Sequence, residues 1–292
     1  MPANFVWHGV AGNYIPLSGD FDGDHHDDVF WYAPGRAADW VWFGRADRHF
    51  DVVREQVLGS YRPVVLDFNG DGRSDVLWYG PGGGHDSVWF GNANHTFSEH
   101  TLAIGGNYEP IAGDFNGDGH DDVIWYGFGA ENDTEWVGAG HGHFATRRAT
   151  INGEYTTAVG DYNGDGRSDI LYDSLDPPHP TYLDFGMANG SFSTNNISGI
   201  TPRSRVFAVD VNHDGADEAF VYNPGAAADS ILYFRRGSIQ VSKRRLTEID
   251  GPNYRPFVGD FDGDGHDDIF WYGPGSLPDH VWFDVANEIP AA

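Results

Sequence analysis

The amino-acid sequence predicts an all-β fold built from six repeats, and three observations carry this prediction. An acidic loop followed by a short apolar run occurs six times, opening at Asp20, Asp67, Asp114, Asp161, Asp210 and Asp260. The repeats, of which the second is the clearest, hold four runs of β-branched and aromatic residues bounded by Gly, Pro and Asn, except that the last lacks its fourth; such runs are typical of short antiparallel strands. No stretch of helical periodicity competes with these runs. Four strands in a repeat of 47 to 50 residues indicate the blades of a β-propeller.

The second repeat shows the four expected strands in order. An apolar run at residues 61–66 leads into the acidic loop at 67–75, and a second run at 76–79 follows it directly. The third run, at 87–90, and the fourth, at 96–102, are separated by Gly91-Asn92-Ala93-Asn94. Several runs that follow the acidic loops are apolar at consecutive positions, so we expect those strands to be covered on both faces.

The two ends of the chain complement each other. No convincing fourth strand follows Val281-Trp282-Phe283, whereas Phe5-Val6-Trp7-His8 stands in the place of a fourth strand before the first acidic loop. We therefore predict one β-propeller domain over residues 1–292, with six four-stranded blades in a ring that the N-terminal strand closes. Such closure removes the open strand edges that invite aggregation.

Composition limits the possible partners. The formal net charge of −27 disfavours nucleic acid, since phosphate binding needs a basic surface. No run of 18 apolar residues predicts a membrane span, and without cysteine disulfides are excluded. The N-terminus lacks the features of a signal peptide, so the protein is either cytoplasmic or, as we expect, secreted with its leader absent from this chain. Oligomeric state cannot be read from the sequence.

The acidic loops carry the predicted metal sites. Oxygen-bearing side chains recur at loop positions 1, 3, 5 and 9, and the main-chain carbonyl of position 7 is expected to face the same point. The expected ligands are Asp20, Asp22, Asp24, His26 and Asp28; Asp67, Asn69, Asp71, Arg73 and Asp75; Asp114, Asn116, Asp118, His120 and Asp122; Asp161, Asn163, Asp165, Arg167 and Asp169; Asp210, Asn212, Asp214, Ala216 and Glu218; Asp260, Asp262, Asp264, His266 and Asp268.

Calcium is the expected ion, about one Ca²⁺ for each of the six repeats, because it prefers six to eight hard oxygen ligands. Position 6 is glycine, which permits the sharp turn, except in the first loop, where His25 is the one awkward fit. The loops are not EF-hands, since position 12 is aromatic or Val in place of a bidentate Glu. We expect each ion to have a structural role and to fasten one blade.

These loops resemble the FG-GAP/VCBS repeats of integrin α-subunit propellers and related proteins. The resemblance rests on loops such as Asp114-Phe115-Asn116-Gly117-Asp118-Gly119 and on the Phe-Gly pairs at 43–44, 90–91 and 185–186. It implies that the loop joins the first two strands of a blade and binds calcium through the acids named above. Six blades depart from the seven of most family members.

Two repeated aromatic series are candidate ligand positions, namely Trp42, Trp89, Trp136 and Trp282 in the third strands and Tyr14, Tyr61, Tyr108, Tyr155 and Tyr254 before the first strands. Aromatic rings beside Asp and Asn suit sugar binding, and repetition would strengthen weak sites. Packing of blade on blade explains the same rings. In the fourth repeat Asp173 and Asp184 replace aromatics.

Recognition of a glycan, by a multivalent lectin-like protein, is the function that we expect. A protein-interaction scaffold is the alternative, and a polysaccharide lyase or glycoside hydrolase is a further one. The chain contains no nucleophile elbow, no His-Glu metal motif and no phosphate loop, and most of its histidines recur with the repeats. We therefore identify no catalytic residue.

Overall fold

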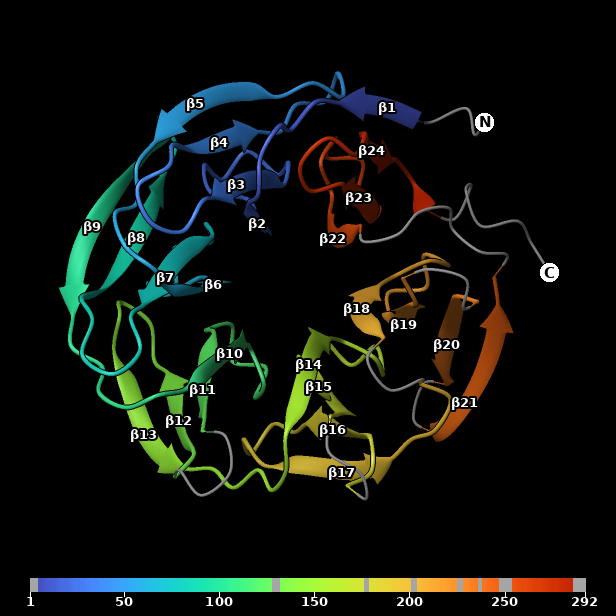
Figure 1. Ribbon diagram of the computed structural model, residues 1–292. Coiled ribbons are helices and arrows are strands. Elements are labelled where there is room, and N and C mark those ends of the chain that lie inside the picture. Colours follow the sequence, from blue (N-terminus) through green and yellow to red (C-terminus); the bar gives the residue numbers. More distant parts are fainter. Residues whose placement is uncertain are drawn as a thin grey trace. The chain divides into compact units, whose positions relative to one another are not determined.

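The computed structural model describes residues 5–127, 132–175, 179–200, 204–224, 228–235, 238–246 and 254–285, and 24 β-strands lie within these ranges. They form six four-stranded antiparallel sheets (Figure 1). The predicted fold class, a six-bladed β-propeller of four-stranded blades, is confirmed. No helix among the described residues is long and apolar enough to cross a membrane.

Five blades use four consecutive strands, in the order of the chain. Their strands are β2 (Ile15–Gly19), β3 (Asp28–Tyr32), β4 (Asp39–Phe43) and β5 (Asp51–Glu55) in blade 1; β6 (Arg62–Leu66), β7 (Asp75–Tyr79), β8 (Asp86–Asn92) and β9 (Thr96–Leu102) in blade 2; β10 (Glu109–Gly113), β11 (Asp122–Tyr126), β12 (Thr134–Gly138) and β13 (Phe144–Arg148) in blade 3; β14 (Tyr155–Gly160), β15 (Asp169–Ser174), β16 (Tyr182–Gly186) and β17 (Phe192–Asn196) in blade 4; and β18 (Arg205–Val209), β19 (Glu218–Tyr222), β20 (Ser230–Arg235) and β21 (Ser238–Arg245) in blade 5.

Blade 6 combines both ends of the chain. It consists of β22 (Arg255–Gly259), β23 (Asp268–Tyr272), β24 (Asp279–Trp282) and the N-terminal β1 (Phe5–His8). Strand β1 pairs antiparallel with β24, with Phe5 opposite Trp282 and His8 opposite Asp279. The N-terminal strand therefore completes the last blade, as the sequence predicts.

The chain divides into two compact units, each with its own apolar core. One unit comprises residues 1–110, 138–145 and 254–292, and the other comprises residues 111–137 and 146–253. The assignment of residues 1–292 to a single domain stays a prediction.

The second strand of every blade is buried along its whole length, which confirms that these strands are covered on both faces. In the first unit, Phe30 and Tyr32 of blade 1 share a core with Val76 and Trp78 of blade 2. The second unit packs blade 3 on blade 4 and blade 4 on blade 5 in the same way. Large apolar side chains thus fill the space between successive blades of each unit, and burial of this area is the main stabilising contribution.

Candidate functional site

The repeated tryptophans lie in the third strands, partly buried against the tryptophan of the second strand. The ring centroids are 5.3 Å apart for Trp31–Trp42, 5.7 Å for Trp78–Trp89, 5.0 Å for Trp125–Trp136 and 4.9 Å for Trp271–Trp282. These contacts make the second-strand tryptophan the centre of an aromatic cluster and leave part of the third-strand ring exposed. The rings therefore pack the blades together and can still offer a face to a ligand.

Four of the five repeated tyrosines are bound by a tyrosine at the end of the second strand of another blade. A fully buried tyrosine at the end of the second strand accepts a hydrogen bond from the main-chain amide of the turn tyrosine, and its hydroxyl donates to a glycine carbonyl in the same turn. The pairs of tyrosines are Tyr272–Tyr14, Tyr32–Tyr61, Tyr79–Tyr108 and Tyr126–Tyr155. Tyr254 is buried, 7% exposed, against Trp271 and His280.

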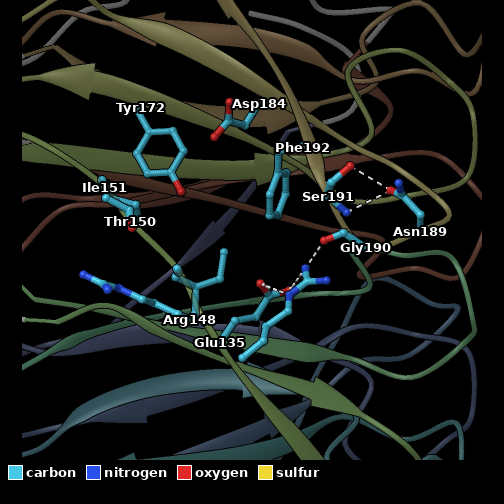
Figure 2. Close-up of a pocket in the computed structure, with 13 residues that line it drawn as sticks. Glu135, Arg148, Thr150, Ile151, Tyr172, Asp184, Asn189, Gly190, Ser191 and Phe192 are labelled. Carbon is cyan, nitrogen blue, oxygen red and sulfur yellow. Dashed lines mark hydrogen bonds and ion pairs between the residues drawn. The ribbon is translucent and has the colours of Figure 1, made fainter.

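Two cavities are relevant to ligand binding, and the first is lined by members of both series. The first has a volume of about 250 Å³ and brings Tyr14 and Trp42 together with Trp31, Trp40 and Val10. The second, of about 320 Å³, lies between blades 3 and 4 and is lined by Glu135, Arg147, Tyr172, Asp184 and Phe192, among others (Figure 2). One predicted pair of ligand positions thus borders a shared aromatic cavity, whereas the second cavity contains charged residues that the sequence analysis did not select.

Each acidic loop folds around the carboxylate at position 1. Asp20 Oδ1 accepts hydrogen bonds from the amides of Gly23 (2.7 Å) and Asp24 (3.1 Å), and its Oδ2 accepts from His25 (3.0 Å). The loops that begin at Asp67, Asp114, Asp161, Asp210 and Asp260 repeat this pattern. The carboxylate satisfies amides that a tight turn would otherwise leave without partners, which explains why the chain begins each loop with Asp.

His25 occupies loop position 6, where the other loops have glycine, by adopting the same backbone conformation. His25 adopts the left-handed region with φ of 71°, as Gly72 does in the second loop with φ of 86°. Histidine tolerates this region better than most residues that carry a Cβ. The first loop therefore has the same turn as the others.

The carboxylate at position 9 joins the loop to the third strand. Asp28 is fully buried, and it accepts hydrogen bonds from the amides of Phe21 (2.8 Å) and Gly44 (2.9 Å). A Cβ on Gly44 would lie 2.5 Å from the carbonyl oxygen of Asp27. Asp75 and Asp169 bind the amides of Gly91 and Gly186 in the same way. The glycine of each Phe-Gly pair is required because the loop backbone passes too close for a side chain.

Burial raises the pKa of these position-9 carboxyls, and neighbouring loop carboxylates raise it further. The pKa reaches about 9 for Asp28, about 7 for Asp75 and about 8 for Asp169, Glu218 and Asp268. Crowded, desolvated carboxylates favour their neutral form unless a cation offsets the charge. A divalent cation bound by the loop would supply that compensation.

The residue at position 3 separates the loops into two kinds. In the third, fourth and fifth loops it is an asparagine, whose side-chain amide donates to the position-9 carboxylate at 3.3, 3.2 and 2.6 Å respectively. In the first and sixth loops it is an aspartate, and a histidine or arginine side chain from the neighbouring blade contacts it. His95 Nε2 lies 2.9 Å from Asp22 Oδ2, and Arg48 Nε donates to Asp262 Oδ2 at 2.7 Å.

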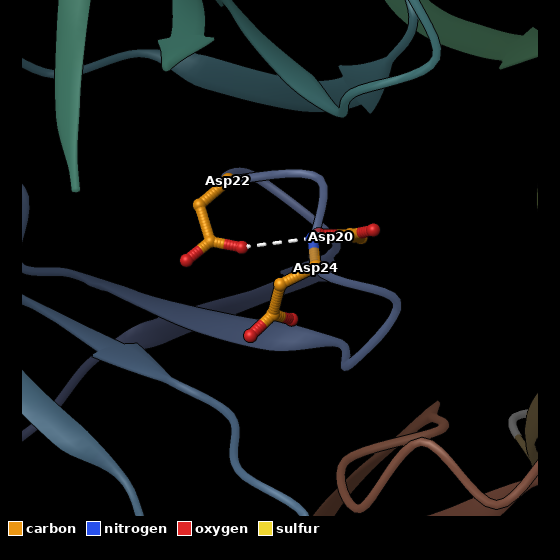
Figure 3. Close-up of side chains that lie close together, drawn as sticks. All are labelled: Asp20, Asp22 and Asp24. Atoms are coloured by element: carbon orange, nitrogen blue, oxygen red, sulfur yellow. Dashed lines mark hydrogen bonds between the residues drawn. The ribbon is translucent and has the colours of Figure 1, made fainter. Parts of the chain in front are cut away.

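The two loops with aspartate at position 3 gather three carboxylates that could hold a metal ion. Their clusters are Asp20, Asp22 and Asp24 (Figure 3) and Asp260, Asp262 and Asp268, with the oxygens of each cluster within 4.8 Å of one another. Asp262 is 7% exposed, and its buried Oδ1 has no hydrogen-bond partner. Carboxylate oxygens, one of which has no hydrogen-bond partner, are suitable ligands for a cation such as Ca²⁺. Metal ligation by these six residues, and by the other predicted ligands, stays a prediction.

A second aspartate series escaped the sequence analysis. Asp39 is fully buried at the start of β4, and its oxygens accept from the amides of Ala33 (2.7 Å) and Val57 (2.6 Å). Asp86, Asp133 and Asp279 make the same two contacts in their blades. Each stands seven residues after the buried tyrosine of its blade. That constant spacing was the signal that could have revealed them.

Comparison with known proteins places the chain in a family. The FG-GAP-like repeat model matches residues 20–78, 67–125 and 114–172, which together span just over half of the 292 residues. The chain therefore belongs to the FG-GAP-like repeat family, as its resemblance implies. No curated protein sequence matches it.

Solved structures show the same fold at low sequence identity. A lectin of Agrocybe aegerita, described as recognising non-reducing terminal N-acetylglucosamine, is 19% identical with a TM-score of 0.60, covering 89% of this chain and 74% of the lectin. AofleA from Arthrobotrys oligospora is 12% identical with a TM-score of 0.57, covering 95% and 86%. The Tc holotoxin pore of Photorhabdus luminescens is 14% identical with a TM-score of 0.63, covering 95% of this chain and 14% of that one.

Proposed function

We propose that this protein is a calcium-binding β-propeller whose role is recognition, with carbohydrate as the ligand. The observation that carries the calcium part is the sixth loop. It holds three carboxylates close together, and one buried oxygen of Asp262 has no partner. Because calcium binding would stabilise only the folded loop, the ions would fasten the acidic loops between the first two strands of their blades.

Consecutive loops are linked, so a bound ion would act on more than one blade. The amide of Ser74 in the second loop donates to the carbonyl of Asp20 in the first at 2.8 Å. The amide of Asp27 in the first loop donates to the carbonyl of Asp260 in the sixth at 2.7 Å. A cation that fixes one loop would therefore also fix the position of its neighbour.

The carbohydrate part rests on the aromatic cavity bordered by Tyr14, Trp31, Trp40 and Trp42. Aromatic faces beside an open cavity suit the apolar face of a pyranose ring, and small-ligand sites are commonly concave and aromatic. The Agrocybe aegerita lectin, a structural neighbour described as recognising N-acetylglucosamine, supports the same class of ligand. Terminal N-acetylglucosamine is the first sugar to test, and an extracellular location would suit both the ligand and calcium.

Glycan-array binding of the calcium-loaded protein, followed by titration calorimetry, tests the proposal. We expect saturable binding of at least one glycan, with weaker binding after Trp42→Ala. Metal analysis of the purified protein should find several calcium ions per chain. An array without a single binding glycan would refute the carbohydrate part, and a protein without bound calcium at millimolar free calcium would refute the metal part.

A further inference from the structure

The cavity between blades 3 and 4 lies where the fourth repeat lacks an indole that the first, second, third and sixth repeats have; the fifth repeat has Leu232 at this place. Trp42 lies opposite Val29 in blade 1, and Trp89 lies opposite Val76 in blade 2. In blade 4 the same register places Asp184 opposite Ile170. A short carboxylate therefore stands where a large ring fills the space in other blades, and part of the cavity of about 320 Å³ is the volume left behind.

An ion pair between the buried Glu135 and the partly exposed Arg147 forms one wall of this cavity. Glu135 stands opposite Ile124, where blades 1 and 2 have Val41 and Val88. It is 2% exposed and binds Arg147 through two contacts, of which Nε to Oε2 measures 2.6 Å. Arg147 also donates to the carbonyl of Gly190. The pair neutralises both of its own charges and fixes this part of the wall, beside which the exposed Arg148 also lines the cavity.

The tyrosine in the opposite wall presents a hydroxyl to the cavity. Tyr172 occupies the position of Trp31 in the repeat, is 1% exposed and stacks on Tyr182 with centroids 4.6 Å apart. Figure 2 shows its hydroxyl pointing into the cavity. No hydrogen bond joins this hydroxyl to a described residue. Burial raises the pKa of Tyr172 well above its usual value, so the hydroxyl is a neutral donor.

Further polar groups are oriented beside it. One oxygen of Asp184 accepts from Thr194, which leaves the other to face the cavity. Asn189 accepts from the amide (3.0 Å) and the hydroxyl (2.7 Å) of Ser191 through Oδ1, so its NH₂ group is available to donate. The ring of Phe192 lies between these groups (Figure 2). Donors, an acceptor and an aromatic face thus converge in one place.

We propose that this cavity is a single-copy binding site for one neutral pyranose residue, held by its hydroxyls. The Tyr172 and Asn189 donors and the Asp184 acceptor would bind adjacent hydroxyls, with Phe192 against the ring. An anion would meet the Asp184 carboxylate, and an apolar ligand would leave the polar groups without partners at a cost. The volume lies at the lower end of about 300–1,000 Å³ for small-molecule pockets. This proposal rests on the proposed carbohydrate recognition and deepens it, because it predicts a site that the repeats do not share.

Two substitutions test the site. Asp184→Trp introduces the residue found at this position in blades 1, 2, 3 and 6 and fills the cavity, so it should abolish binding there without lowering the melting temperature. Tyr172→Phe removes only the hydroxyl and should weaken binding up to about tenfold, as the loss of one hydrogen bond does. The probes are the methyl glycosides of N-acetylglucosamine, galactose, mannose and fucose, titrated at millimolar concentration in calcium. Stoichiometry is measured by calorimetry and contacts by saturation-transfer NMR.

The outcomes separate this inference from the proposed function. Loss of one binding site per chain in Asp184→Trp, with reduced affinity in Tyr172→Phe, supports the cavity as the site. Unchanged binding in both variants, with loss only in Trp42→Ala, overturns the inference and leaves the proposed function standing. Absence of binding by the unaltered protein to all four glycosides and to the glycan array overturns both. If Asp184→Trp does not fold, Tyr172→Phe alone decides.

Discussion

The buried aspartate at the start of a third strand should be among the most sensitive positions for stability. Asp39 is fully buried and supplies the acceptors for the amides of Ala33 and Val57, at 2.7 and 2.6 Å. Asp39→Asn keeps the shape but turns an NH₂ group toward one of these amides. One buried amide and the new NH₂ group then lack partners, and each such loss costs about 1–3 kcal/mol. We therefore expect a loss of about 2–6 kcal/mol in the free energy of unfolding.

Urea unfolding followed by tryptophan fluorescence measures this loss, with Asp51→Asn as the matched control. Asp51 lies in the same blade but is about half exposed, and it pairs with Arg45 at 3.0 Å. An exposed ion pair contributes about 0–1 kcal/mol. The midpoint should shift strongly for Asp39→Asn and hardly at all for the control, with the slope unchanged. Equal midpoints for the two variants would refute the assignment of the Asp39 carboxylate as the link between Ala33 and Val57.

Three more predictions concern the acidic loops and the glycines beside them. Without metal, the raised pKa values of the position-9 carboxyls, about 7 to 9, mean that the folded protein holds protons that the unfolded chain releases near pH 4. The stability of the chelated protein should therefore fall as pH rises from about 4 toward the raised pKa values. Saturating calcium, which competes with protons, should reverse this slope. Melting temperatures at pH 5 and 8 that change alike with and without calcium would contradict this. Arg48→Met should destabilise the metal-free protein by about 1–3 kcal/mol, because Asp262 loses its charged partner. Calcium should recover most of this loss of stability. Arg45→Met, which removes an exposed ion pair, is the control in the same denaturation assay. Gly91→Ala should lower the free energy of unfolding by about 1–3 kcal/mol through overpacking, because the new Cβ would lie 2.2 Å from the carbonyl oxygen of Phe21. Gly105→Ala is the control: its Cβ would have no atom within 4 Å, so thermal melts should show unchanged stability.

Much of the fold could be predicted from the sequence because its signals are local and repeated. A run such as Val76-Leu77-Trp78-Tyr79 predicts a strand covered on both faces, and the whole of β7 is buried. Residues 5–8 were predicted to complete the last blade, and they pair with β24. The turn of the loop that begins at Asp20 can be predicted from the local sequence, because the amides that donate to the Asp20 carboxylate all lie within five residues of it.

The remaining features depend on residues that are distant in the chain and adjacent only after folding. Arg48 contacts Asp262 across 214 positions of sequence, so no spacing rule could pair them. The constant spacing of Asp39 and its equivalents after the buried tyrosines marks them as a series, but their partners are main-chain amides, which have no sequence signature. The replacement of a tryptophan by Asp184 was visible in the sequence, yet only packing of blade 3 on blade 4 makes it a wall of a cavity. The sequence by itself determined the strands, the repeats and the acidic loops, since these follow from neighbouring residues. Tertiary structure alone decided which charges meet and where space remains, because packing between blades sets both.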